Sequence, residues 1–392
     1  MPKDDYVNID EIKQRLLLEI DKLKTPDGYL NAGYPRYNTL FGRDSLISAW
    51  QTLKIDSSIA KATLKILAKY QGKITDPMSE EEPGKILHEH RFTIEEQKKL
   101  PNWKFPYYGS VDSTPLFIFL AAQYLRETGD KSFVKGIMKN ILDAYLWIRN
   151  YGDLDRDGYV EYKRKNPYGL FHQGWKDGTE DHLGIKPPVA IVEVQGYVYA
   201  AYQSLEFLIK EIGGKISRNI SPIKKTLKSK FNRDFWMKKE NFFALALDGD
   251  KKQKKTVTSN PGHLLFTGIV LEDKVELLVS RLFKEDLWTP YGIRTHSSLE
   301  PDFDPYSPHL GCIWPHDNWI IYKGLQKLGF TSYAGRIKEA LLRVYKKLGK
   351  IPEFYAVSRG EVVDMSTIEK ESTANPLQAW ASAGLLEMIW SD

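Results

Sequence analysis

The sequence predicts an all-α fold, an (α/α)6 barrel of six helical hairpins with its functional loops on one face. Two observations lead to this prediction. Amphipathic helical segments dominate the 392 residues, and short and long connections alternate between them. If consecutive helices pair antiparallel, all the long connections lie at the same end of the ring. No linker rich in Pro or Ser interrupts the chain, so residues 1–392 are predicted to form a single domain.

Twelve segments carry the helical pattern, and the helices are expected near residues 7–24, 44–54, 57–71, 113–129, 131–150, 188–211, 221–234, 263–270, 272–284, 317–329, 331–348 and 376–390. Short links such as Asp130 and Leu271 join some of them. The six long connections are 25–43, 72–112, 151–187, 235–262, 285–316 and 349–375. Within the fourth of these, residues 242–247 before Asp248-Gly249-Asp250 indicate a small β-hairpin.

Composition limits the class of protein. Hydrophobic residues make up 42% and charged residues 27%, as expected of a soluble globular chain with a sizeable core. The net charge of +5 is spread widely, and the run Lys251–Lys255 favours a solvated hairpin tip over a nucleic-acid patch. The single cysteine, Cys312, excludes an internal disulfide and favours a reducing compartment. Without a signal-like or membrane-length apolar stretch, we expect a cytoplasmic protein with no membrane or nucleic-acid partner.

The loop 170–182, LFHQGWKDGTEDH, holds the densest group of polar and aromatic residues. It has no helical or strand periodicity, and Gly174 and Gly178 allow sharp turns on either side of Trp175 and Asp177. A flat apolar Trp ring in such a loop is suited to stacking on a sugar. We therefore predict a general acid beside a sugar-stacking platform. The alternative is an acidic solvated loop with one buried Trp.

Other long connections carry further candidate residues. Arg43 and Asp44 lie at the start of a helix, where Asp44 could simply be an N-cap and Arg43 offers a fork of donors for sugar hydroxyls. Asp112 or Ser113 could likewise cap the next inner helix. Glu353 stands between apolar neighbours and is expected to be partly desolvated or paired, a costly state that function can justify.

Metal and cofactor motifs are weak. Asp153–Gly158 begins like a calcium loop, but Arg164 stands at the twelfth position, where such a loop needs Glu. A tight acidic turn is the favoured interpretation, and a different calcium site using Glu161 is the alternative. The spacing of His88-Glu89-His90 does not suit a helical zinc pair, and the chain has no phosphate-binding glycine loop. We predict no metal and no cofactor.

Glycoside hydrolysis needs two carboxyl groups on opposite sides of the scissile bond. Asp177 and Glu353 are 176 residues apart, so only the fold can bring them together, and the predicted ring places both on one face. Glu180 and Glu371 compete with Glu353 as the second carboxylate. Glu180 is too near Asp177 in sequence, and Glu371 lies in a polar stretch that indicates a solvated surface.

The chain also resembles a known family at these positions. Taken in order, its motifs are similar to those of the glycogen-debranching-like (amylo-α-1,6-glucosidase) group of inverting glycoside hydrolases, which are more distantly related to glucoamylases. The matching motifs are FGRDSL (41–46), GKILHE (84–89), YYGSVDSTP (107–115), HQGWKDG (172–178), VEVQGYVYAA (192–201), SNPGHLL (259–265), GCIWPHDN (311–318), IPEF (351–354) and NPLQAWASA (375–383).

The resemblance implies roles for individual residues. Asp177 would be the general acid and Glu353 the general base. Residues implied to surround the terminal glucose are Arg43, Asp44, Gln173, Trp175, Glu193, Gln195, Trp314 and His316. The chain departs from similar sequences, which read NQGWKDS, at His172 and Gly178, so contacts near the acid are expected to differ. Many members of the group carry an N-terminal β-sandwich that is absent here, which favours an oligosaccharide or a small glucoside as substrate.

The expected activity is therefore that of an inverting, exo-acting glycoside hydrolase that releases terminal glucose from α-linked oligosaccharides or small glucosides, with α-1,6 among the candidate linkages. Its two carboxyl groups should lie roughly 6.5–9.5 Å apart. The alternatives are an inverting phosphorylase or a sugar epimerase on the same barrel, or a non-catalytic sugar-binding protein. A matching Glu353 argues against the phosphorylase, which would replace the base with a phosphate site. These residues leave the linkage and the oligomeric state open.

Overall fold

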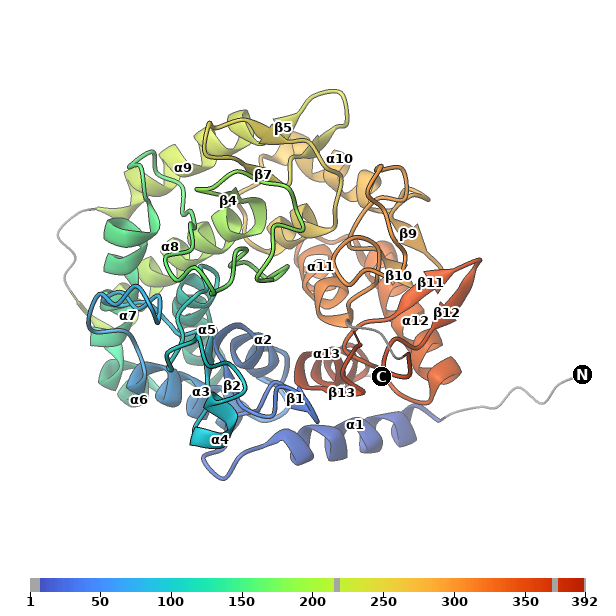
Figure 1. The fold of residues 1–392 in the computed structure, drawn as a ribbon, viewed down its shortest axis with the longest axis horizontal. Coiled ribbons are helices and arrows are strands. Elements are labelled where there is room, and N and C mark those ends of the chain that lie inside the picture. The colour runs from blue at the N-terminus through green and yellow to red at the C-terminus, as the bar shows by residue number, and fades with distance from the viewer. Residues whose placement is uncertain (1–7, 215–218, 369–372, 391–392) are drawn as a thin grey trace, which may run out of the picture.

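Six inner helical elements form a closed ring in the computed structural model, which describes residues 8–214, 219–368 and 373–390. Each inner element packs against the next, and the last returns to the first (Figure 1). They are α2 (Gly42–Gln51), α5 (Ser113–Thr128), α8 (Val192–Ile212), η2 (Asn260–Phe266), α11 (Pro315–Lys327) and α13 (Ala379–Ile389). The fold is an (α/α)6 barrel, which confirms the predicted fold class.

The outer helices alternate with the inner ones along the chain. They are α1 (Ile9–Leu23), α3 (Ser57–Lys69), α7 (Met138–Trp147), α9 (Ile220–Asp234), α10 (Glu272–Leu282) and α12 (Thr331–Leu348). Outer helices bury a single stripe: in α1 this is Ile12, Leu16, Ile20 and Leu23. Inner α13, enclosed on several sides, is buried at nearly every position. None of the described helices has the length and apolar character needed to cross a membrane.

Two of the predicted helices differ from the structure by more than a small shift of their ends, and one short helix was not predicted. The expected helix 131–150 divides into α6 (Lys131–Gly136), α7 and a π-helical turn η1 (Ile148–Gly152), and Gly136 at the break is a weak helix former. The expected helix 188–211 begins only at Val192, because Pro187 and Pro188 precede the short strand β4 (Ala190–Ile191). A short helix, α4 (Ile94–Gln97), was not predicted; Thr93 caps it.

The expected helix 263–270 is instead the short 3-10 element η2, residues 260–266. Close packing against α11 explains its form. A Cβ added to Gly262 would lie 2.6 Å from Ile321, and one added to Gly324 would lie 2.4 Å from Leu265. The two backbones therefore approach each other at distances that only glycine allows.

Short antiparallel strands connect the long loops at one end of the barrel. β1 (Gly33–Tyr34) pairs with β13 (Leu377–Gln378), and β2 (Leu40–Phe41) pairs with β3 (Glu89–His90). The remaining sheets are β4–β7 (Ala246–Leu247)–β8 (Gln253–Lys254), β5 (Trp236–Met237)–β6 (Phe242–Phe243), β9 (Trp288–Thr289)–β10 (Gly292–Ile293) and β11 (Ala356–Ser358)–β12 (Glu361–Val363). The small hairpin predicted at 242–247 before Asp248-Gly249-Asp250 is present as β7 and β8, which pair antiparallel across the turn 248–252, whereas β6 pairs with β5.

The basic run begins in the turn of this hairpin, as the sequence suggested, but Lys251 is paired with acidic side chains instead of being free in solvent. Lys251 Nζ lies 2.6 Å from Asp155 Oδ2 and 3.0 Å from Asp157 Oδ2, and it also contacts Glu161. Asp153, Asp155 and Glu161 are close enough together to share a cation. In this structure the ammonium group of Lys251 supplies positive charge to the acidic turn that resembled a calcium loop.

Candidate active site

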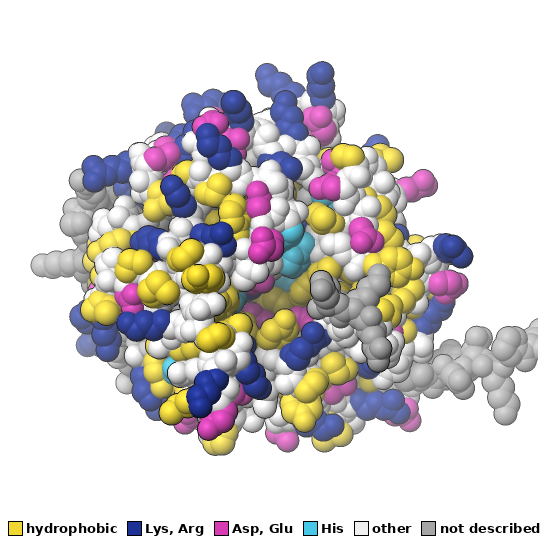
Figure 2. All heavy atoms as spheres, viewed as in Figure 1, with side chains coloured by type: hydrophobic (Ala, Val, Ile, Leu, Met, Phe, Trp, Pro, Cys, Tyr) yellow, Lys and Arg dark blue, Asp and Glu magenta, His cyan; other side chains and the backbone are white. Residues whose placement is uncertain are grey.

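A cavity of about 400 Å³ opens at the N-terminal ends of the inner helices. Figure 2 shows this face hollowed at the centre of the ring, with acidic and histidine side chains beside hydrophobic ones. Five of the six long connections contribute to its lining. Residues that line it include Arg36, Arg43, Asp44, Glu89, Arg91, Trp175, Asp177, Trp314, Glu353, Phe354 and Trp380.

Arg43, in the first turn of α2, is the centre of the charge network. One of its terminal nitrogens donates to Asp112 Oδ2 at 3.0 Å and to the Gly174 carbonyl at 2.9 Å, and the other contacts Asp177. Burial alone would lower the pKa of Arg43, but Asp112 and the neighbouring carboxylates raise it above its ordinary value. The guanidinium therefore stays charged and fixes the loop that carries Asp177.

Asp112 was one of two candidates for a helix cap, and the structure shows its side chain in other contacts. It occupies the N-cap position of α5, yet within the described part of the chain its side chain makes no capping hydrogen bond. Its oxygens accept from Arg43 and, at 2.7 Å, from Ser110 Oγ. The YYGSVDSTP motif contained this residue, but only the fold shows that it pairs with Arg43.

Asp177 lies at the cavity edge, with its side chain 29% exposed. Burial raises the pKa of Asp177, and the contact with Arg43 opposes that rise. The loop is closed by a bridge between His172 and Gly178. His172 is buried, and its ring bonds Tyr162 Oη at 2.7 Å and Asp181 Oδ1 at 2.9 Å. His172, where this chain differs from similar sequences, therefore stabilises the loop through buried hydrogen bonds.

Aromatic rings form one wall of the cavity. Trp175 lies edge-on to Trp314, with ring centroids 5.8 Å apart, and stacks on His263 at 5.8 Å. Trp314 in turn stacks on Phe354 at 4.8 Å. His316 does not line the cavity; it lies parallel to Trp380, with ring centroids 3.8 Å apart. This wall offers the apolar surface against which a sugar ring packs.

Glu353 lines the same cavity and is buried, as its apolar flanks predicted. Its Oε2 accepts from the Asn375 backbone N–H at 2.8 Å, while the Glu353 N–H donates to the Asn375 carbonyl at 3.0 Å. Burial raises the pKa of Glu353 to about 8, and the charges of Asp44 and Asp177 add to that rise. Asp177 and Glu353 therefore line one cavity, and their negative charges repel each other.

Asp44 connects these two parts of the site. Phe41, not Asp44, is the N-cap residue of α2. Asp44 Oδ1 accepts from Gln378 Nε2 at 3.2 Å, and Gln378 Oε1 accepts from Asn375 at 3.0 Å. Burial raises the pKa of Asp44 to about 7, against the opposing charge of Arg43. Asn375 and Gln378 were overlooked as functional residues, although both stand in the NPLQAWASA motif.

Several residues predicted to bind substrate lie behind the cavity wall. Gln173 Nε2 bonds Glu80 Oε2 at 3.3 Å, and the amide of Gln195 holds the backbone of Val160. Glu193 is fully buried on α8, where burial raises its pKa to about 7. These three residues do not line the cavity.

The competing carboxylates take different places. Glu180 is exposed on the surface beyond Asp177. Glu371 lies outside the described residues. Of the three candidates weighed as the second carboxylate, Glu353 is the one that the structure shows lining the cavity.

The sequence matches the family model of the mannosylglycerate hydrolase MGH1-like glycoside hydrolase domain over residues 37–372. The chain belongs to this family. The match spans the loops that carry Asp177 and Glu353, and it makes the protein a glycoside hydrolase by family. The family model describes MGH1-like glycoside hydrolases and not specifically the glycogen-debranching enzymes that the sequence motifs resembled. A comparison with curated proteins found no match.

Solved structures share the fold at low sequence identity. A GH63 mannosylglycerate hydrolase from Thermus thermophilus, in complex with Tris, is 14% identical, with a TM-score of 0.71 over 97% of this chain and 100% of the other. A complex of that hydrolase with glucose gives 14% and 0.70, with the same coverage. A wild-type glycosidase gives 13% and 0.67, over 98% of this chain and 96% of the other. Such likeness supports the (α/α)6 architecture.

Proposed function

We propose that this family member is an inverting, exo-acting hydrolase that releases one terminal glucose from small α-linked glucosides or oligosaccharides. The observation that carries the proposal is the convergence of Asp177 and Glu353 in one cavity from loops far apart in sequence. Asp177 would protonate the glycosidic oxygen. Glu353 would take a proton from the water that attacks the opposite face of the anomeric carbon.

The contacts of the two carboxyl groups with other protein groups oppose these roles, so we propose that substrate contacts change them. Asp177 contacts Arg43, which favours its ionised form, whereas Glu353 has a pKa raised to about 8 and holds a proton at neutral pH. A sugar hydroxyl that accepts from Arg43 would weaken its contact with Asp177. The pKa of Asp177 would then rise further, since burial is its largest cause. Substrate binding would therefore favour the protonated form of Asp177, which a general acid requires.

The shape of the cavity supports removal of a terminal residue. Asp44 and Arg43 stand at the buried end, where the inner helices close the floor, and aromatic rings line the wall. Contacts to the remote hydroxyls of one sugar would position its anomeric carbon between the two carboxyl groups. About 400 Å³ holds a ligand of roughly one or two sugar rings, not a polymer segment.

Glycosides of a small acid are the second candidate substrate. Besides Arg43, two further guanidinium groups, those of Arg36 and Arg91, line the cavity, although Arg91 already pairs with Glu89. An arginine fork binds a carboxylate well. The name of the similar Thermus thermophilus enzyme specifies a hexosyl glycerate, and another structure of that enzyme contains glucose.

A substrate screen tests the proposal. Purified protein would be given α-1,4-, α-1,6- and α,α-1,1-linked glucosides together with glucosylglycerate and mannosylglycerate, and free hexose would be measured. Release of one hexose per molecule from a small substrate, without phosphate, is the expected result. Turnover that requires phosphate would identify a phosphorylase, and tight sugar binding with no turnover would identify a binding protein. Either result would contradict the proposal.

A further inference from the structure

A second cavity, of about 460 Å³, opens at the opposite end of the barrel, among the C-terminal halves of the inner helices. Its lining comes from α2, α5, α8, α11 and α13 and from Phe266 of η2, and it shares no residue with the cavity described above. The connections between helices at this end, such as 129–130 and 328–330, are short, and the cavity opens to solvent between them. Nothing in the proposed hydrolysis uses it.

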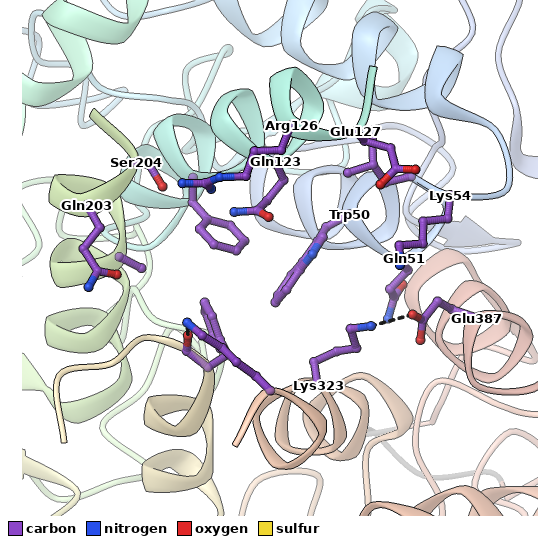
Figure 3. A pocket seen from close by; sticks show the side chains of 15 residues that line it. Trp50, Gln51, Lys54, Gln123, Arg126, Glu127, Gln203, Ser204, Lys323 and Glu387 are labelled. Atoms are coloured by element: carbon purple, nitrogen blue, oxygen red, sulfur yellow. Dashed lines mark hydrogen bonds and ion pairs between the residues drawn. The ribbon is translucent and has the colours of Figure 1, made fainter. Parts of the chain in front are cut away.

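Trp50, near the end of α2, projects into the middle of this cavity (Figure 3). Other rings hold it on several sides: Phe119 and Trp319 each lie nearly perpendicular to it, with centroids 4.8 Å away, and Phe266 lies 5.0 Å away. The indole is half-buried. A rigid, partly exposed indole is a surface on which a sugar or another flat ring stacks.

Cations without carboxylate partners border the ring. Across the described ranges, neither Arg126 of α5 nor Lys327 of α11 forms an ion pair with Asp or Glu. Arg126 has its guanidinium carbon 4.1 Å from the centroid of Phe207, so its in-plane N–H donors stay available. Lys323 differs, because it pairs with Glu387 at 2.6 Å. The helix dipoles favour basic residues in these last turns but do not require them to converge on one cavity.

Neutral polar groups complete the lining. The amides of Gln123 and Gln203 face the cavity from α5 and α8, and in the view of Figure 3 Arg126 and Gln203 lie on one side of Trp50, while Glu127 and Glu387 lie on the other. Gln51 is fully buried; its Nε2 donates to the Trp380 carbonyl at 2.9 Å, and its Oε1 has no hydrogen-bond partner among the described residues. An orphan buried acceptor in a cavity wall favours a ligand that carries hydroxyl donors.

We propose that this cavity is a binding site for a small anionic sugar. The ring would lie against Trp50, hydroxyls would bond the glutamine amides, and a phosphate or carboxylate group would be held by Arg126 and Lys327. Lys327 Nζ donates one hydrogen bond to the Phe266 carbonyl at 2.6 Å, so its other N–H groups remain for the anion. Ring stacking, amides and a guanidinium fork are together the chemistry that recognises such a molecule. The site would be independent of the catalytic one.

Isothermal titration calorimetry on the full chain tests this, with glucose 6-phosphate, glucose and inorganic phosphate as probes. Glucose 6-phosphate should bind more tightly than either fragment alone. Arg126→Ala should weaken its binding at least about tenfold, since a charged hydrogen bond is lost. The matched control, Arg233→Ala, removes an equally charged helical residue whose side chain is 71% exposed and should leave binding unchanged.

Further variants separate the site from the active centre and from misfolding. Asp44→Ala should leave glucose 6-phosphate binding intact, and Arg126→Ala should leave hydrolysis intact. Because Arg126 packs on Phe207, Gln123→Ala provides a second, gentler test. It should weaken glucose 6-phosphate binding but not that of inorganic phosphate. The proposal is overturned if glucose 6-phosphate does not bind, if it still binds normally to the Arg126 and Gln123 variants, or if Asp44→Ala abolishes binding.

Discussion

The two ends of the barrel use the same helices in opposite ways. At the N-terminal ends, long loops bury Arg43, Asp44 and Glu353 and force their charges to interact. At the C-terminal ends, short links leave Arg126 and Lys327 exposed around Trp50. Burial by the loops is what raises the carboxyl pKa values at the first end. The comparison indicates that loop length, rather than the helical frame, decides which end can perform chemistry.

The largest expected effect comes from Asp177→Asn. Loss of the proton donor should lower kcat on natural glycosides by roughly 10²–10⁴-fold. Substrates with good leaving groups need little protonation, so their hydrolysis should suffer less. Kinetics on a natural glucoside and on a nitrophenyl glucoside measure the difference.

Glu180→Gln is the matched control, since Glu180 is exposed three residues further on. It should leave both activities near the wild-type values. If the Asp177 variant lost activity equally on both substrates, Asp177 would not be the general acid. If the Glu180 variant lost activity only on the natural glucoside, Glu180 would be the general acid instead.

Asp44→Ala should have the next largest effect, because Asp44 is buried in the cavity and not at a cap position. Loss of the hydroxyl contact would misplace the reacting bond and lower kcat/KM by about 10²-fold. A residue that only capped a helix would cost about 1 kcal/mol of stability and leave activity per folded molecule unchanged. Steady-state kinetics and thermal melting of the same variant distinguish the two cases.

The sequence predicted the ring, the face that carries the site and the place of Glu353 among apolar residues. Helical periodicity and loop lengths are local signals, and they sufficed for these. Pairings across long distances were not predictable, such as Arg43 with Asp112 or Gln378 with Asp44, because no local pattern encodes them. Gln173 and Gln195 were placed in the pocket by motif alone, whereas their amides bond protein groups behind the wall. Close packing at Gly262 likewise replaced a predicted helix with η2.

The pH dependence of kcat/KM sharpens the assignment of roles. The pKa of Glu353 is raised to about 8 by burial and by nearby carboxylates, and a general base acts only when ionised. If Glu353 is the base, kcat/KM should rise with pH toward about 8. If Glu353 were the acid, the same group would produce a fall above that pH. Initial rates at low substrate concentration from pH 5 to 9 decide between them.

Stability should depend on pH through the same group. A carboxyl with a raised pKa binds more protons in the folded state, so it lowers the free energy of unfolding as pH rises from about 4.5 to about 8. Glu353→Gln removes that loss while keeping an oxygen for the Asn375 N–H. Its melting temperature relative to wild type should therefore be higher at pH 8 than at pH 5, by roughly 2 °C or more. A pH-independent difference would show that Glu353 is not strongly perturbed.

The smallest effect on hydrolysis should come from the other end of the barrel. Arg126→Ala, in the absence of any added ligand, should change kcat/KM by less than about twofold, because surface substitutions away from a site are nearly neutral. A loss of kcat/KM comparable to that of Asp44→Ala would show that the two ends of the barrel are functionally coupled, and it would contradict the difference between them.

The most direct test of the central claim is proton NMR of the first sugar released. The claim is that Asp177 and Glu353 act from opposite sides of the bond, with one water between Glu353 and the anomeric carbon. Hydrolysis of an α-glucoside should then yield β-glucose first, with the α-anomer appearing only by mutarotation. Initial release of α-glucose would indicate a covalent intermediate and would contradict both the base assignment and the inverting mechanism.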